Sequence, residues 1–468
     1  MRLAPLGDFF VFSDFLWIGE VALNFDLTTD RIGKSLVAFS LPMIFGNLVQ
    51  QLYNVADTLI VGKTIGATAL AAVGSSYTLM VLLTSIILGL CMGSGVVFAQ
   101  LYGAKREEDM KTSIFNSFVF VLLLSAIINI LAYLLLDRFI LWLNIPVEAV
   151  DFTREYLEII FAGMIFVTIY NFIAAVLRSV GNTVMPLVFL AVSVVTNIVL
   201  DIVLIVCFDM AVTGAALATV IAQALSALCI TVYFGVKAKS LHPRRRHMRY
   251  SGRLLHLIIQ NSLLTAVQQS IMNFGILMVQ SLVNSFGFAA SAAFAVGVKI
   301  DAFAYMPAQD FGNAFATYIA QNYGAKKPDR IRAGLLIAAK LSAAFCLTAS
   351  VLVWFLAKPL MLLFVNAQET ETIRIGVQYL HIVGACYVGI GILFLWYGFY
   401  RGLGKAPVSI VLTIISLGLR VLLAYALSAI PAVGMLGIWW AVPIGWALAD
   451  LYGIWYFYRE KTQLLSGD

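Results

Sequence analysis

The stretch that decides the fold is "FAQLYGAK", Phe98 to Lys105, because it returns almost unchanged as "IAQNYGAK", Ile319 to Lys326. Gln100 and Gln321 are 221 positions apart, close to half of the 468-residue chain. Each copy ends a long apolar run and is followed at once by charged residues. The stretch therefore marks equivalent points in two halves of one chain.

Two further pairs of motifs keep nearly the same spacing and the same order. "RSVGNTVMP" begins at Arg178 and "RGLGKAP" at Arg401, while "AAVG" begins at Ala71 and "FAVG" at Phe294. Because the matches are collinear, we interpret each half as a repeat of one structural plan.

The composition excludes an ordinary soluble protein. The chain is 62% hydrophobic and 12% charged, with a mean hydropathy of +0.95, and a soluble domain cannot bury so much apolar surface. The five cysteines stand singly in apolar runs, which suggests neither a metal site nor a disulfide framework. The net charge of +6 comes from basic residues in short loops beside apolar runs, a pattern of membrane orientation rather than nucleic-acid binding.

Twelve apolar runs are long enough to cross a bilayer, which takes about 20 residues. We place them at 36–61, 69–101, 112–136, 153–178, 185–208, 212–236, 254–284, 289–322, 332–357, 373–400, 407–430 and 434–457. The long polar stretch "LHPRRRHMRYSG", Leu241 to Gly252, divides them into six and six. We expect an all-α membrane protein with an N-terminal extension (1–30), an N-lobe (31–240), a loop (241–252), a C-lobe (253–460) and a tail (461–468).

Lysine and arginine set the expected orientation. If the N-terminus is inside, the inner loops and chain ends hold 21 of these residues and the outer loops five. We therefore expect a multi-pass protein of the plasma (inner) membrane with both termini in the cytoplasm. The first 25 residues are interrupted by Asp8, Asp14 and Glu20, so we expect a disordered or interfacial extension rather than a thirteenth span.

Two six-helix units that enter the membrane in the same direction are typical of transporters whose substrate path runs between the halves. The repeated stretch then lies at the cytoplasmic end of the second helix of each unit. Gly103 and Gly324 can stop that helix, and Lys105 and Lys326 can hold its end in the cytoplasm. Capping and orientation alone would explain the repeat, and so would a role in a cytoplasmic gate.

The motifs resemble those of the multidrug and toxic compound extrusion (MATE) family of secondary exporters. The resemblance rests on A-Q-x-Y-G-A-K in both halves, "PAQDFGNAFATYIAQNYGA" from Pro307, "NVADTLIVG" from Asn54, and the R-x-x-G turns at Arg178 and Arg401. It covers roughly residues 27–460. It implies twelve helices in two pseudo-symmetric six-helix lobes around a V-shaped cavity, and export of cationic or amphipathic organic compounds driven by inward flow of Na⁺ or H⁺.

The N-terminal half carries two deep acids without a deep basic partner. Asp57 lies in the first run and Asp201 in the fifth, and burying an ionised group at mid-bilayer costs about 2.5–3.5 kcal/mol even on a lenient scale. Asn197 is four residues before Asp201 on the same helix face, and Thr219 adds a hydroxyl from the next run. This all-oxygen set suits a proton or a hard cation, although the same groups could simply join helices. In the family that this chain resembles, residues at these four positions form the cation site, so Asp57, Asn197, Asp201 and Thr219 are the expected coupling residues and the metal ligands if the ion is Na⁺.

The C-terminal half holds both signs of charge at depth. We expect Lys299, Asp301, Asp310 and Arg420 to cancel one another in a buried network. Some relatives carry acids in helices 7 and 10 of this lobe, where the chain offers Gln268, Gln269 and His381 instead, so we place coupling in the N-lobe. His381 could carry a proton, but a packed, hydrogen-bonded histidine is the expected role, and Asp450 is expected to be structural.

Proline and substrate residues complete the expectations. Pro42, Pro307 and Pro443 interrupt apolar helices, and we expect the bend at Pro307 to change during transport.

Aromatic rings and amides suit a flat organic cation. The expected cavity residues are Gln51, Tyr53, Asn54, Asn171, Asn273, Gln280, Phe294 and Tyr397.

The sequence thus predicts a cation-coupled multidrug exporter that works by alternating access, with no cofactor, small organic substrates, the bilayer as its surroundings and no oligomeric partner. The alternative is a flippase for lipid-linked saccharides of the same superfamily, which would line its cavity with several arginines. An enzyme is not expected, because the chain has no nucleophile elbow, H-E-x-x-H motif or Walker loop.

Overall fold

The computed structural model describes residues 26–65, 67–142, 145 and 147–466. The predicted N-terminal extension lies almost entirely outside this part of the chain, so its structure is not addressed. The described residues form helices and connecting turns only, which suits a lipid environment because a helix satisfies its own backbone hydrogen bonds.

The described residues of the first half form seven α-helices with three short helical turns. They are α2 (Ile32–Thr64), α3 (Ala67–Gly103), α4 (Glu107–Leu134), α5 (Leu136–Trp142), η1 (Val147–Ala149), α6 (Val150–Ser179), α7 (Val184–Asp201), η2 (Ile202–Cys207), α8 (Ala211–Lys237) and η3 (Lys239–Leu241).

The second half repeats this plan with two of its spans broken. Its elements are η4 (Arg245–His247), α9 (Gly252–Asn284), α10 (Phe288–Gly324), α11 (Pro328–Leu362), α12 (Thr370–Gly384), α13 (Tyr387–Gly402), α14 (Ala406–Thr413), η5 (Ile414–Gly418), α15 (Leu419–Ser428) and α16 (Met435–Ser466). The π-helical turns η2 and η5 interrupt the fifth span and the eleventh.

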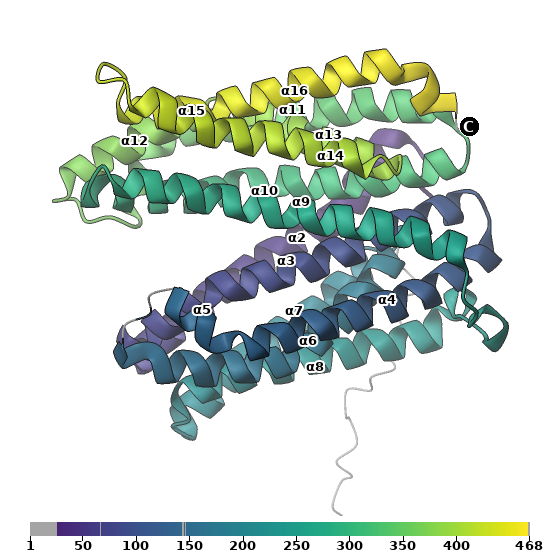
Figure 1. The fold of residues 1–468 in the computed structure, drawn as a ribbon, viewed down its shortest axis with the longest axis horizontal. Coiled ribbons are helices and arrows are strands. Elements are labelled where there is room, and N and C mark those ends of the chain that lie inside the picture. Colours follow the sequence, from purple (N-terminus) through teal and green to yellow (C-terminus); the bar gives the residue numbers. More distant parts are fainter. Residues whose placement is uncertain (1–25, 66, 143–144, 146, 467–468) are drawn as a thin grey trace, which may run out of the picture.

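These elements make twelve spans in two pseudo-symmetric lobes. Figure 1 shows α2–α8 stacked in one group, the N-lobe, and α9–α16 in a second group, the C-lobe. Ten described helices are long and apolar enough to cross a membrane by themselves, and α12 with α13, bent by 52°, makes an eleventh span. The twelfth is α9, which is equally long but carries the side-chain amides of Gln260, Asn261, Gln268 and Gln269.

Small residues allow the lobes to meet along α3 and α9. A Cβ on Gly89 would lie 2.4 Å from the Cα of Ala266, and one on Gly93 would lie 2.4 Å from the carbonyl oxygen of Asn261. Two glycines four residues apart let helix backbones approach closely in a bilayer. A hydrogen bond of 2.9 Å between the side chains of Ser94 and Ser262 also joins α3 to α9.

The polar loop between the lobes is fastened to the N-lobe. Glu108 at the start of α4 accepts hydrogen bonds from Arg246 at 2.8 Å and contacts the buried His247 ring nitrogen at 2.8 Å. Asn116 of α4 donates to the carbonyl of Arg249 at 2.9 Å. The loop therefore follows α4 rather than hanging free in solvent.

Prolines lie inside four helices rather than three. Pro42 is within α2, Pro307 within α10 and Pro443 within α16, as expected, and Pro359 near the end of α11 is a further case. Whether the bend at Pro307 changes between states stays a prediction.

Candidate functional site

Two acidic side chains from separate helices meet inside the N-lobe. Asp57 lies in the C-terminal third of α2, and Asp201 is the last residue of α7. Asp57 is 7% exposed and Asp201 is fully buried, and the two carboxyl groups are close enough to share a hydrogen bond. Two ionised carboxylates have no proton to share, so this contact requires a proton on one of them or a cation between them.

The end of α7 is shaped to present Asp201 together with Asn197. The π-helical turn η2 follows Asp201 directly, and such turns often re-aim side chains at functional sites. Asn197 lies one turn earlier on the same face and is buried. With its amide oriented to suit both neighbours, Asn197 donates to Asp201 at 2.9 Å and accepts from the Thr219 N–H at 3.1 Å.

Thr219 of α8 and the ring of Tyr53 complete the site. The Thr219 hydroxyl lies 3.2 Å from the Tyr53 hydroxyl, and Thr219 is 3% exposed. Oδ1 of Asp57 and Oδ1 of Asp201 are buried without any hydrogen-bond partner among the described residues. The site therefore offers two free carboxyl oxygens, an amide and a hydroxyl, a donor set that suits a proton or a hard cation such as Na⁺.

The structure thus brings together all four residues expected to bind the coupling ion. Among the described residues, no lysine or arginine forms a salt bridge with Asp57 or Asp201. The role of the four residues in coupling stays a prediction, since their geometry shows proximity and not ion movement.

The C-lobe acid Asp301 has a different environment. It is 4% exposed, and its two carboxylate oxygens accept hydrogen bonds from the hydroxyls of Tyr379, at 2.5 Å, and Tyr387. Arg420 and Asp301 line the same cavity of about 30 Å³, roughly the space of one water molecule, but form no salt bridge with each other. Asp301 is therefore satisfied by neutral donors.

The expected four-residue charge network does not form. Lys299 is exposed and has no ion-pair partner among the described residues, whereas Asp301 and Asp310 are buried. Asp310 instead faces the N-lobe, where Asn47 of α2 donates to both of its oxygens at 3.1 and 2.9 Å. The four charges therefore occupy three separate environments.

The repeated stretch closes one end of the molecule, the end that the basic residues predict to be cytoplasmic. A Cβ on Gly103 would lie 1.9 Å from the carbonyl oxygen of Gln321, and a Cβ on Gly324 would lie 1.9 Å from that of Gln100. The two copies thus pack against each other across the lobes. We call this contact, made by Gln100, Gly103, Gln321 and Gly324, the motif clasp.

Each glutamine of the motif clasp also reaches into the opposite lobe. Gln100 donates to the carbonyl of Gly402 at 2.9 Å, and Gln321 donates to the carbonyl of Ser179 at 2.7 Å. Gly402 and Ser179 belong to the two R-x-x-G turns, so both repeated motifs meet in one pseudo-symmetric contact.

The expected reason for Gly103 and Gly324 needs correction. Each ends its helix, but the residues with left-handed backbone are Lys105 (φ 57°) and Lys326 (φ 53°), two positions later. Glycine is needed at 103 and 324 because backbone of the other lobe occupies the space of a side chain.

The expected substrate residues fall into three groups. Gln51, Tyr53 and Asn54 are half-buried on α2 next to the N-lobe acids, and Asn171 is half-buried on α6. Gln280 bonds Asn284 on an exposed part of α9, while the side chain of Asn273 lies outside the described residues. Phe294 and Tyr397 are corrections: Phe294 stacks on Trp439, and Tyr397 bonds Ser416 at 2.9 Å, both in the C-lobe core.

Some functional candidates had no clear signal in the sequence. Asn47, Tyr379 and Tyr387 are ordinary polar residues in apolar helices, and only the fold shows that they bind Asp310 and Asp301.

His381 stacks on Trp354 with ring centroids 4.3 Å apart and contacts its carbonyl at 3.1 Å, as a packed histidine would. Oδ1 of Asp450 has no hydrogen-bond partner among the described residues, and the structural role expected for Asp450 stays a prediction.

Comparisons of the sequence with a family model and with known proteins agree on one family. The MatE family model matches the chain twice, over residues 42–203 and 265–426. The probable multidrug resistance protein YpnP of Bacillus subtilis (strain 168) is 30% identical over 84% of this chain and 87% of its own length. YoeA of the same organism, also described as a probable multidrug resistance protein, is 27% identical over 92% of this chain and 95% of its own.

Solved structures show the same fold. A multidrug resistance MATE family transporter of the MOP superfamily, described as being in an outward-facing conformation, superposes with a TM-score of 0.88 at 23% identity. The superposition covers 94% of this chain and 98% of that one.

Proposed function

The chain belongs to the MATE family of membrane transporters, and from that premise we propose that it exports amphipathic organic cations in exchange for an inward-moving Na⁺ or H⁺ bound between Asp57 and Asp201. The observation that carries the proposal is the contact between these two buried carboxyl groups. Since the pair needs a positive charge to be stable, its loading and unloading can be coupled to a change of conformation.

The position of the pair connects ion binding to the movement of helices. Asp57 lies on α2, which also contacts the C-lobe through the hydrogen bonds of Asn47 with Asp310. Asp201 lies on α7, next to the π-helical turn η2. A cation held between them joins α2 to α7, and its loss lets the like charges separate the two helices.

Opening and closing of the motif clasp is the second step of the proposed transport cycle, after ion binding. With the predicted cytoplasmic end closed, the path between the lobes can open only toward the outside, and export then requires the motif clasp to separate when the cargo is collected. Each lobe contributes one glycine and one glutamine, so closure can proceed as a rigid approach of two similar surfaces.

The proposed class of cargo rests on the descriptions of the relatives and on the half-buried side chains of α2. YpnP and YoeA are described as probable multidrug resistance proteins, and the half-buried Gln51, Tyr53 and Asn54 lie beside the acids. A flat organic cation can stack on Tyr53 and be attracted by the negative site, so ion and cargo compete for one electrostatic environment. The flippase alternative needs arginines lining the path, whereas Arg420 lies buried beside Asp301 in the C-lobe.

Transport in reconstituted vesicles tests the proposal. The purified protein is placed in vesicles with ethidium as cargo, and transport is measured under a Na⁺ gradient alone and a pH gradient alone. We expect one gradient to drive transport in the wild type and neither to do so after Asp57→Asn or Asp201→Asn. Unchanged gradient dependence in both variants would exclude the N-lobe pair as the coupling site.

A further inference from the structure

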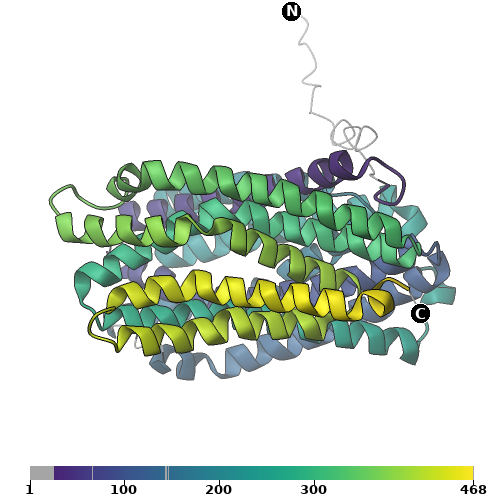
Figure 2. The same ribbon diagram turned by 90° about the horizontal axis from the view of Figure 1, so that it is seen from above.

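A groove opens between α13 and α16 on the side of the C-lobe that is remote from the N-lobe. Figure 1 places α16 at the outer edge of the C-lobe, and Figure 2 shows α13 and α16 next to each other on that face. The groove has a volume of about 460 Å³ and is lined chiefly by Val388, Gly389, Pro443, Ala447 and Leu451. Ala447 and Leu451 are exposed, so the groove is open to the bilayer.

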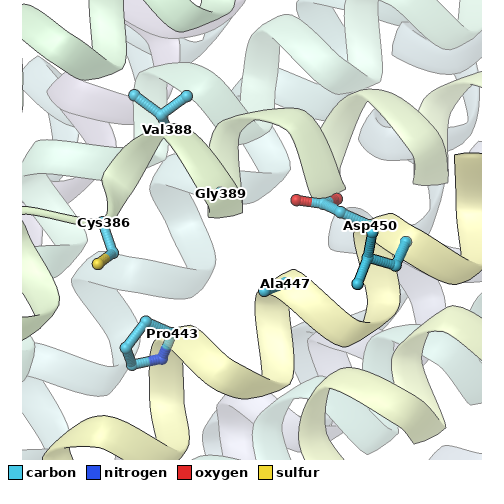
Figure 3. A pocket seen from close by; sticks show the side chains of 7 residues that line it. Cys386, Val388, Gly389, Pro443, Ala447 and Asp450 are labelled. Carbon is cyan, nitrogen blue, oxygen red and sulfur yellow. The ribbon is translucent and has the colours of Figure 1, made fainter.

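Two helix interruptions create this space. The tenth span bends by 52° between α12 and α13, just before Val388 and Gly389. Pro443 interrupts α16 on the other side and cannot donate to the carbonyl of Trp439, four residues earlier. Because the facing residues Gly389 and Ala447 are small, no side chain fills the space between the two helices (Figure 3).

One carboxylic acid, Asp450, lies among the described residues that line the apolar groove. Figure 3 shows its carboxyl group directed into the space between the two helices, and its Oδ2 lies 4.0 Å from the position of a Cβ on Gly389. Its Oδ1 is buried and has no hydrogen-bond partner among the described residues. A carboxyl group in apolar surroundings is costly, so a group that pairs with it would be stabilising.

We propose that this groove binds a lipophilic amine from the bilayer, with the ammonium group on Asp450 and the apolar body along Val388, Ala447 and Leu451. The volume lies in the range of small-molecule sites, which are mostly apolar with few polar groups. The ammonium can pair with the Asp450 carboxyl group that lines the groove, and the exposed side of the groove lets the apolar body enter without crossing water.

This site is separate from the coupling site, because Asp57 and Asp201 belong to the N-lobe and Asp450 to the C-lobe. Binding of the amine requires neither an ion gradient nor separation of the motif clasp. The inference can therefore fail while the proposed antiport holds, and the reverse is equally possible.

Photolabelling of the full-length protein in phosphatidylcholine nanodiscs tests the inference. The probes are a diazirine-bearing dodecylamine and the matching diazirine-bearing dodecanol, and labelled peptides of α13 and α16 are quantified by mass spectrometry. We expect the amine to label the groove about tenfold more in the wild type than in Asp450→Asn, because a charge-assisted hydrogen bond is lost. The alcohol should label both proteins weakly and equally.

Two further variants separate the groove from general effects. Asp329→Asn, which removes an exposed acid of α11, should leave labelling unchanged. Gly389→Val should suppress labelling by the amine, since the Cβ itself has only ordinary contacts, with Trp446 at 3.6 Å, and the added methyl groups enter the groove. Equal amine labelling in wild type and Asp450→Asn would overturn the inference, and so would equal labelling by amine and alcohol, which would indicate an acyl-chain groove.

Discussion

The two lobes repeat one backbone plan, but the N-lobe pair Asp57 and Asp201 and the C-lobe acid Asp301 have opposite environments. In the N-lobe, Asp57 and Asp201 face each other, and each keeps one carboxyl oxygen without a partner. In the C-lobe, Asp301 is saturated by the hydroxyls of Tyr379 and Tyr387. The first arrangement is stable only with an added cation or proton, whereas the second needs nothing further.

The difference shows how a symmetric fold acquires an asymmetric function. A carboxylate that accepts hydrogen bonds from neutral donors has no reason to exchange ions, so Asp301 can act as a fixed joint between α10, α12 and α13. A pair of acids that lacks such donors changes its energy whenever an ion arrives or leaves. Duplication supplies the two lobes, and a few polar residues decide which lobe responds to the ion.

The largest effect should come from replacing an aspartate of the N-lobe pair with asparagine, with the same exchange in the C-lobe as the control. Asp57→Asn or Asp201→Asn removes a carboxylate from the unsatisfied pair, so we expect ion affinity to fall by at least ~10–100-fold and gradient-driven export to disappear. Asp301→Asn is the matched control, in which the gradient dependence of the remaining export should be unchanged. Ethidium transport in vesicles under each gradient measures both, and a loss of gradient dependence in Asp301→Asn alone would reverse the roles of the lobes.

The sequence predicted most of the fold because its signals are long. Each of the twelve apolar runs coincides with a helical span, and the family match recurs 223 residues later, as the repeated motifs require. The four N-lobe site residues could be named because Asp57 and Asp201 are acids in apolar runs and Asn197 stands four residues before Asp201, and the family resemblance matched these residues and Thr219 to one site.

The C-lobe was harder to predict because helix rotation is not encoded in hydropathy. Lys299, Asp301 and Asp310 share one apolar run, yet they face three different environments around α10. Partners such as Asn47 and Tyr387 lie far away in sequence, so no local pattern connects them to these acids. The helices do end at Gly103 and Gly324, but the contact that requires glycine there could not be predicted, since the backbone that these residues accommodate belongs to the other lobe.

The next effect should come from adding a methyl group to the motif clasp. Gly103→Ala and Gly324→Ala each place a Cβ 1.9 Å from a carbonyl oxygen, so closure should be destabilised by about 1–3 kcal/mol. Gly235→Ala is the control, because that glycine lies on α8 with nothing within 4 Å of its Cβ position. Distances between spin labels at this end should lengthen in both clasp variants, and unchanged distances would show that the contact does not set the conformation.

A smaller effect is expected from the tyrosines that hold Asp301. Tyr379→Phe or Tyr387→Phe leaves one carboxylate oxygen of a buried acid without its donor, which should cost about 1–3 kcal/mol of stability. Tyr425→Phe, at a half-exposed position, should cost little. Thermal unfolding in detergent measures the loss, and a change in ion dependence instead of stability would place Asp301 in the coupling mechanism.

The smallest effect compares the two glutamines of the motif clasp. Gln321→Met should cost about 1 kcal/mol, because the Gln321 side chain and Ser179 are both fully buried and the carbonyl of Ser179 is left without its donor. Gln100→Met should cost less, because Gln100 is only half-buried and water can replace its bond to the carbonyl of Gly402. Thermal unfolding of both variants and of the double variant separates the two contributions. Equal losses of stability would mean that the two pseudo-symmetric hydrogen bonds contribute equally. The expected inequality would show that the C-lobe glutamine stabilises the contact more than the N-lobe glutamine does.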